Sequence, residues 1–443
     1  MTTLSKAALI AALMLGAGSL TVAAPALAKR KEEAPAAPKY GEAFRKPALA
    51  AQTAIQAKNY DAATAPLAEA ESLAISDDEK YLTAHLRLSY ENGKLALAAA
   101  GDPKAIVAGR IALLPSLNAI IDNPKTPSAE LITFLEFRGA TYFDSKKYAE
   151  AVADLSRARE LGSTNQDVSL QIMKAKAESG DAIGAAAELQ SQIDREKAAG
   201  RKVPENWYNY VLSKLYFSKK YAESAAWSQK VVSAYPTAAN WRQWVRVYME
   251  TIPVTSAKLD KSQRIDLFRL LRAAHAMADQ NDYDEYAQAT DDLGLNAETK
   301  AVIDEGRASG KIPAGDGLAS MLAGSAKTGL SLEKSLDATE KQAVAAKTGD
   351  LAAQTADVYL AGGNNAKAIE LYKVALTKPF DQPTPGSKRR YVTAAEVNTH
   401  LGIALAQSGD KEAARAAFKS VTGAPRADIA GFWLTWLDLG SAG

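Results

Sequence analysis

The chain carries a phrase of small and aromatic residues that recurs about every 34 residues. Its clearest copy combines Gly139, Tyr142, Tyr148, Ala151 and Ala158. A period of this length is typical of stacked helical hairpins, because one hairpin cannot bury its apolar side without a neighbour. We therefore expect a continuous repeat array in place of separate globular domains.

The clearest unit of the array runs over residues 131–162 and predicts two amphipathic helices joined by a short turn. Gly139 and Ala151 are small, so that the two helix backbones can approach each other closely. Tyr142 and Tyr148 are expected to fill the wedge beside them. No stretch of the chain shows a sustained alternation rich in β-branched residues, so no strand is predicted.

Other copies of the phrase are more degraded. Turns with a following small residue occur at Lys58-Asn59-Tyr60, Gly180-Asp181, Lys220-Tyr221, Gly363-Asn364 and Gly409-Asp410. Residues 251–345 are the least regular, and Gly306–Gly329 is interpreted as a loop with short helices because Gly and Ala dominate it. Phe432–Leu437 predicts a final apolar helix that would cap the end of the stack.

Taken together, these units resemble the tetratricopeptide-repeat (TPR) family, firmly over 131–248 and 350–422. Because its first 28 residues also have the pattern of a secretory signal, described below, the chain is similar to exported TPR proteins of alphaproteobacteria. The resemblance implies an all-α fold, an α-α superhelix or TPR-like solenoid of antiparallel helix pairs. Its concave groove would be lined by the first helices and would dock a peptide or a partner helix. Arg138, Met173 and Ser224 depart from the family pattern.

The resemblance carries groove positions onto two of the first helices. They are Glu136, Ala140 and Phe143 in one unit and Asn209, Ser213, Tyr216 and Phe217 in another. The alternative is that these are ordinary surface residues without a ligand. Between Trp207 and Tyr248 lie 11 of the 32 aromatic residues, which favours packing between repeats over an aromatic binding surface. The Lys/Asn/Arg clamp of chaperone-binding members is not found.

The expected organisation has six parts. They are a signal peptide (1–28), a disordered linker (29–43), degenerate helical repeats (44–130), a central TPR array (131–250), a divergent helical region with a Gly-rich loop (251–345), and C-terminal TPR units with a capping helix (346–443).

The first residues have the pattern of a secretory signal. Lys6 precedes the apolar stretch 7–24, and Ala26-Leu27-Ala28 is a small-x-small cleavage site. The alternative is a retained anchor, since residues 7–28 are uncharged and long enough to span a bilayer. We expect cleavage near Ala28 and export to the periplasm or beyond. The chain has no cysteine, so neither disulfides nor a lipid anchor is expected. No later apolar run is expected to span a membrane.

Charge excludes one class of partner. Removing residues 1–28 deletes one lysine, leaving 52 Lys and Arg against 51 Asp and Glu. A nucleic-acid binder needs a surplus of cations to neutralise phosphates, so no nucleic-acid partner is expected. The basic run Lys388-Arg389-Arg390 is interpreted as an exposed loop.

Residues with catalytic or metal-binding chemistry are sparse. The chain has three histidines, His85, His275 and His400, and we expect none of them to have a second ligand at helical spacing. No metal or cofactor is therefore expected. No nucleophile elbow follows a strand, although a Ser-His-Asp arrangement stays open. Residues 324–328 lack the spacing of a phosphate loop, and the acidic cluster 279–292 lacks that of a calcium loop.

The function expected from these observations is a non-catalytic interaction scaffold in the periplasm. An envelope-assembly adaptor for polysaccharide or cell-wall machinery is the alternative, and an enzyme on the solenoid is the least favoured. A polar cavity that holds His, Asp and Ser within hydrogen-bonding distance would favour the enzyme.

Overall fold

The computed structural model describes residues 38–255, 258–332, 336–382 and 391–440. All regular elements in these ranges are helices, and no strand occurs there. Consecutive helices pack in successive pairs. The expectation of an all-α, superhelix-like fold is therefore confirmed. The expected signal peptide (1–28), most of the expected linker and the basic run 388–390 lie outside the described residues.

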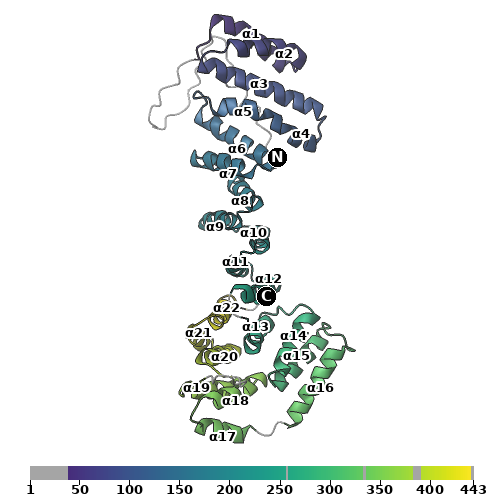
Figure 1. Ribbon diagram of the computed structural model, residues 1–443, viewed down its shortest axis with the longest axis vertical. Helices are drawn as coiled ribbons and strands as arrows, with labels where there is room; N and C mark the ends of the chain where they lie inside the picture. The colour runs from purple at the N-terminus through teal and green to yellow at the C-terminus, as the bar shows by residue number, and fades with distance from the viewer. Residues whose placement is uncertain (1–37, 256–257, 333–335, 383–390, 441–443) are drawn as a thin grey trace. The chain divides into compact units, whose positions relative to one another are not determined.

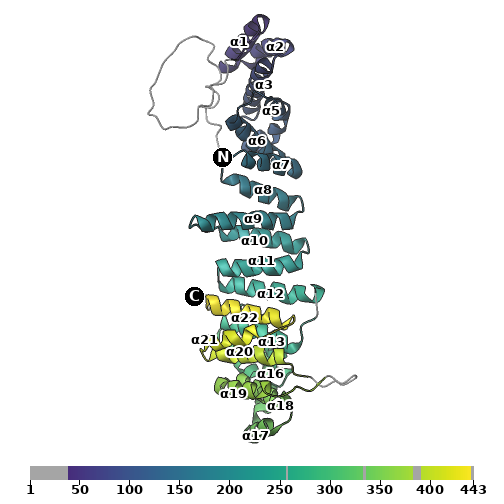
Figure 2. The same ribbon diagram turned by 90° about the vertical axis from the view of Figure 1, so that its left-hand side faces the viewer.

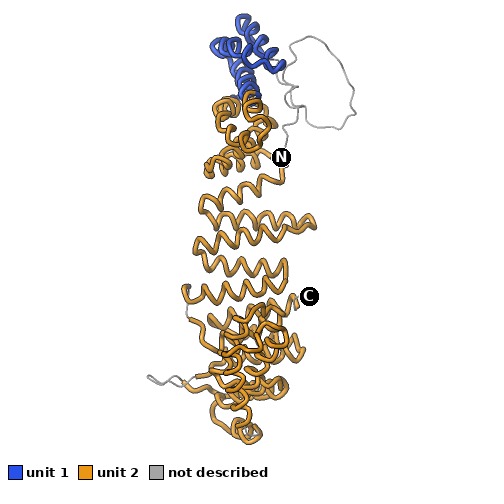
Figure 3. Tube along the Cα trace, turned by 90° about the vertical axis from the view of Figure 1, so that its right-hand side faces the viewer, with its two compact units in different colours: residues 1–93, 123–125 blue, residues 94–122, 126–443 orange. Residues whose placement is uncertain are grey.

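The chain forms two compact units, which Figure 3 shows in different colours. The first comprises residues 38–93 and 123–125 of the described chain. Its helices are α1 (Glu42–Gln56), α2 (Tyr60–Leu73) and most of α3 (Asp77–Ala98). Phe44, Leu67 and Leu86, one from each helix, are buried in its core. This unit therefore has a small apolar centre of its own.

The second unit contains the other helices (Figure 1). They are α4 (Pro103–Gly109), the 3-10 helix η1 (Arg110–Leu113), α5 (Leu114–Ile121), α6 (Ser128–Asp144), α7 (Tyr148–Glu160), α8 (Asp167–Glu178), α9 (Ala182–Ala198), α10 (Glu205–Phe217), α11 (Tyr221–Ala234), α12 (Ala238–Thr255), α13 (Lys261–Ala273), α14 (Gln280–Asp291), α15 (Asn296–Ala308), α16 (Gly317–Leu332), α17 (Asp337–Ala345), α18 (Asp350–Ala361), α19 (Asn365–Leu376), α20 (Ala394–Gln407), α21 (Lys411–Lys419) and α22 (Arg426–Leu439).

One turn geometry joins the two helices of each clear hairpin. A residue with positive φ ends the first helix, and the N–H of the next residue bonds the carbonyl five residues earlier, as in Lys147 N to Tyr142 O at 2.8 Å. This is the Schellman arrangement, which favours glycine. The positive-φ residues are Lys58, Lys146, Gly180, Lys219, Gly363 and Gly409. The repeated phrase therefore encodes a repeated turn, even where lysine replaces glycine.

Close approach of the paired helices explains the small residues of the phrase. A Cβ at Gly139 would lie 2.8 Å from Cγ of Leu155, and Ala151 and Leu155 have no exposed surface. The same relation recurs in α20 and α21, where a Cβ at Gly402 would lie 2.5 Å from Cε1 of Phe418. The expected role of Gly139 and Ala151 is confirmed.

The final apolar helix expected at Phe432–Leu437 is present as part of α22. It does not cap a free end of the stack, so that part of the expectation is wrong. Figures 1 and 2 show α22 beside α12 and α13, far earlier in the chain. The ring of Phe432 stacks on Trp244 with centroids 3.9 Å apart. Trp433 is fully buried, and its Nε1 donates to the carbonyl of Asp266 at 3.2 Å. Helices α13 to α22 thereby close on themselves.

Two stretches of the second unit differ from expectation. Most of Gly306–Gly329, interpreted as a loop with short helices, belongs to α15 and to the 16-residue helix α16.

The helical run Pro103–Ile121 is long and apolar enough to cross a membrane by length and composition alone, where no such run was expected. Its Arg110 lies 3.7 Å from Asp144, and its Leu117 is fully buried. Core helices of soluble proteins also have this composition.

Candidate functional site

The predicted groove residues lie on α6 and α10, which α7, α8 and α9 separate along the chain. Glu136 is half-buried and accepts hydrogen bonds from Ser163 and, at 2.8 Å, from Asn165. Phe143 packs edge-on against Tyr148. Phe143 is thus held within its own hairpin, and Glu136 is held by the connection between α7 and α8. Ala140 beside them is half-buried. The α6 positions therefore make mainly structural contacts.

The α10 positions are more open. Ser213 is exposed, and Phe217 is 80% exposed, the most of any aromatic named here. Tyr216 is half-buried, and its hydroxyl donates to Glu250 Oε2 of α12 at 3.0 Å. Asn209 is half-buried, and its Oδ1 has no hydrogen-bond partner among the described residues. We therefore take the Tyr216–Phe217 end of α10 as the accessible part of the predicted groove.

Polar contacts connect successive first helices on this side of the array. Glu178 of α8 accepts from Tyr210 at 2.8 Å and from Lys214 at 2.9 Å, both on α10. The hydroxyl of Tyr216 continues the series to Glu250 of α12. Of the 11 aromatic residues between Trp207 and Tyr248, five are half-buried and five are at most 6% exposed: Tyr208, Trp227, Trp241, Trp244 and Tyr248. The preference for packing in this segment is confirmed.

A cavity of about 500 Å³ lies next to this end of α10, where α12, α13 and α14 meet. Glu250, the partner of Tyr216, is one of its lining residues. Its walls combine four cations, two acids and apolar side chains: Arg242, Arg246, Lys258, Arg264, Glu250, Glu285, Met249, Pro253 and Leu259, together with Asn281. Polar groups converging on a cavity of this size are typical of a ligand site.

A second constellation lies in the closed part of the unit and is built from buried charges. Asp266 of α13 is fully buried and bonds Arg426 of α22 and, at 3.1 Å, Arg269 of its own helix. Arg269 also holds Glu298 of α15 through a pair of bonds at 2.8 and 2.6 Å. His400 of α20 lies 3.3 Å from Asp266. This charge cluster connects α13, α15, α20 and α22.

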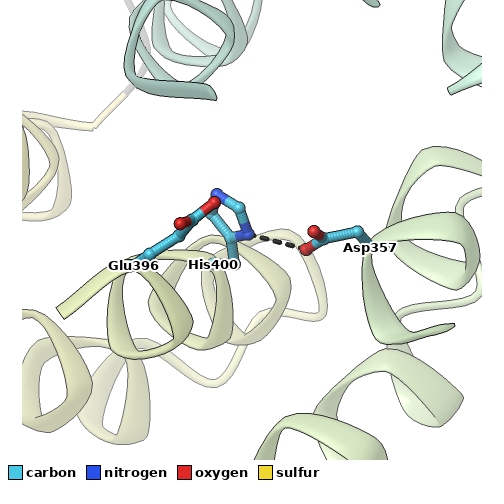
Figure 4. Close-up of side chains that lie close together, drawn as sticks. All are labelled: Asp357, Glu396 and His400. Carbon is cyan, nitrogen blue, oxygen red and sulfur yellow. Dashed lines mark hydrogen bonds and ion pairs between the residues drawn. The ribbon is translucent and has the colours of Figure 1, made fainter. Parts of the chain in front are cut away.

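His400 is the centre of the charge cluster. Figure 4 shows its ring directed at Asp357 of α18, with Nδ1 and Oδ1 2.7 Å apart. Its Nε2 faces Asp266 Oδ2, so both ring nitrogens face carboxylates. Burial alone would lower the pKa of His400, but the charges of Asp266 and Asp357 outweigh it and raise that pKa above its usual value. The two carboxylate contacts and the raised pKa therefore favour protonation of both ring nitrogens.

The cluster brings Ser262, His400 and Asp357 within hydrogen-bonding distance, beside a cavity of about 370 Å³. Ser262 Oγ lies 3.3 Å from His400 Nε2, and the other ring nitrogen faces Asp357. The serine, histidine and aspartate are therefore connected in the same order as in a hydrolytic triad. However, a triad histidine must accept a proton at Nε2, and here that nitrogen faces the carboxylate of Asp266, which favours keeping a proton on it. Ser262 also donates to Glu396 at 2.8 Å. The contacts of a triad are present, while the carboxylate at Nε2 opposes its chemistry.

Asp357, Glu396 and His400 also offer ligand atoms within 4.8 Å of one another, a spacing that could hold a metal ion (Figure 4). The guanidinium of Arg426 lies 3.5 Å from Glu396 and 2.8 Å from Ser262. A divalent cation among these ligands would lie close to that guanidinium and would have to displace the proton of His400. The donor set therefore fits a proton better than a metal ion.

Sequence reasoning missed this cluster because its members are far apart in the chain. One signal was available, since Glu396 and His400 are four residues apart and share a helix face. The statement that no histidine has a second ligand at helical spacing is therefore wrong for His400. No protein-family model and no curated protein matches the chain, so the site rests on its geometry.

Proposed function

We propose that this chain is an exported, non-catalytic TPR-type scaffold that docks a peptide or partner helix on the first-helix side of its second unit. The observation that carries the proposal is Phe217. An aromatic side chain that is 80% exposed favours a partner surface, because aromatic residues dominate interface energetics. Its neighbour Tyr216 is fixed by Glu250, so the surface around Phe217 is preorganised.

A photo-crosslinking residue at position 217 tests this proposal in cells that express and export the full chain. The matched control carries the same residue at Ile183, which is 45% exposed on the second helix α9. We expect one discrete crosslinked protein or peptide product from position 217 and none from position 183. Equal labelling at both positions, or no product at either, would refute docking on the first-helix side.

A second candidate, a serine hydrolase, is favoured by one observation, the contact of Ser262 with His400. A fluorophosphonate probe reacts with an activated serine, and Ser262→Ala removes the site of reaction. Because the carboxylates of Asp266 and Asp357 favour a proton on each ring nitrogen of His400, we expect no labelling of the full chain. Labelling that depends on Ser262 would replace the scaffold proposal with the enzyme.

A further inference from the structure

We propose that the cavity between α12, α13 and α14 binds a side-chain carboxylate of an extended acidic peptide. Phe217 would then contact an apolar residue of the same peptide. This inference rests on the proposed scaffold function and deepens it by naming the chemistry of the partner. The cavity and the exposed end of α10 are adjacent, because Glu250 both lines the cavity and accepts from Tyr216.

Two of the four cations in the cavity are fixed by the protein. Arg242 bonds Asp282 at 2.7 Å, and Arg246 bonds Asp282 and, at 3.1 Å, Glu285. Asp282 is fully buried behind them. Its charge and that of Asp279, which bonds Arg242 at 2.6 Å, neutralise the two guanidiniums. These arginines therefore form a rigid wall and are not the main source of attraction.

The other two cations retain donors for a ligand. Within the described residues, Arg264 uses only Nη2 in hydrogen bonding, to Glu285 at 2.8 Å. Lys258 is exposed and has no hydrogen bond or ion pair there. Nε and Nη1 of Arg264 and the ammonium of Lys258 are thus available, and such donors form charge-assisted hydrogen bonds with a carboxylate.

The apolar side chains of the cavity favour a peptide over a small free anion. Met249, Pro253 and Leu259 line it beside the cations. They would contact the methylene groups of a Glu side chain or its neighbour, while the carboxylate meets Arg264 and Lys258. The whole chain is almost neutral, so long-range attraction of polyanions is weak and the local donors decide binding.

The test measures fluorescence anisotropy of a labelled twelve-residue peptide of repeating Gly-Leu-Glu-Ser units, amidated at its C-terminus. Amidation removes the terminal carboxylate, so only the Glu side chains can occupy the site. With the full chain, we expect the Glu peptide to bind at least about tenfold more tightly than a Gln counterpart, since charge-assisted hydrogen bonds are lost. The difference should shrink as salt is raised.

Variants locate the binding. Arg264→Gln and Lys258→Gln should each weaken the Glu peptide about tenfold and leave the Gln peptide unchanged. The matched control is Lys300→Gln, which removes an exposed lysine whose one ionic partner in the described part of the chain is Asp304. Phe217→Ala should weaken both peptides. Circular dichroism verifies that each variant keeps its helix content.

The outcomes separate this inference from the proposed function. No binding of the Glu peptide, equal binding of the Glu and Gln peptides, or tighter binding of the polyanion heparin at the same residues overturns the carboxylate site. If crosslinking at position 217 then still succeeds, the scaffold stands with a different partner chemistry. If that crosslinking fails as well, both are overturned.

Discussion

Replacing Arg426 by methionine should weaken the attachment of the C-terminal helix α22 to the ring that it closes. Arg426 is 6% exposed and bonds Asp266, and its Nη2 donates to Ser262 at 2.8 Å. Methionine replaces the aliphatic stem of the side chain and removes its charge and donors. Asp266, which has no exposed surface, would retain only Arg269 and His400 as partners.

The expected loss in the free energy of unfolding follows from the burial of the Arg426–Asp266 ion pair. Removing one partner of a buried ion pair costs about 3–5 kcal/mol, because the remaining charge stays desolvated. The aromatic contacts of α22, such as Trp244 on Phe432, would be kept. We therefore expect a loss of about 3–5 kcal/mol in the free energy of unfolding by urea, followed by circular dichroism. Hydrogen exchange should accelerate first in α22 and α13.

The chain offers a matched control on the neighbouring helix. Arg415 of α21 also bonds an aspartate, Asp438, which is 60% exposed. Arg415→Met should cost only about 0.2–1 kcal/mol, as surface ion pairs usually do. Similar losses for the two variants would refute the argument that burial of the charge cluster determines the effect. A double variant with Asp266→Asn should cost less than the sum of its parts.

Three further predictions concern the same unit. The pKa of His400 is higher in the folded than in the unfolded chain. The contribution of His400 to the free energy of unfolding is therefore complete below about pH 6.5 and is lost as the pH rises through the folded pKa. Urea unfolding midpoints of the wild type and of His400→Gln, measured from below about pH 6.5 to above neutral pH, test this dependence. Lys146→Gly should stabilise by about 0.5–1 kcal/mol, because Lys146 has a φ of 60°, whereas Lys147→Gly should not; thermal unfolding compares them. Gly402→Ala should destabilise by about 1–3 kcal/mol through its clash with Phe418, measured by urea unfolding.

The local fold could be predicted because the repeat phrase records contacts within one hairpin. Gly139 and Leu155 lie 16 positions apart, and their close approach is repeated by Gly402 and Phe418. A constraint of this kind leaves the same residue types at the same spacing in each unit. Helix pairing, turns and buried small residues can therefore be predicted from a single sequence.

The closure by α22 and the charge cluster could not be predicted in this way. Arg426 meets Asp266 across 160 positions, and no repeated pattern marks so distant a contact. The acids and cations of the cluster are common residue types on helices, where they usually face solvent. Glu396 and His400 are the candidate ligand pair that the sequence places on one helix face. This pair indicates a possible site only together with Asp357, a second carboxylate that lies on another helix.

The charge cluster also has a consequence for how α22 finds its place. Aromatic contacts alone, such as Phe432 on Trp244, tolerate small displacements because apolar burial has no direction. Sliding α22 by one helical turn, about 5.4 Å, would take Arg426 out of reach of Asp266 and leave both charges buried without each other. That penalty discriminates against shifted registers far more than apolar contacts do. We therefore infer that the aromatic residues of α22 supply most of the attraction to the ring, while Arg426 selects the single position at which the ring closes.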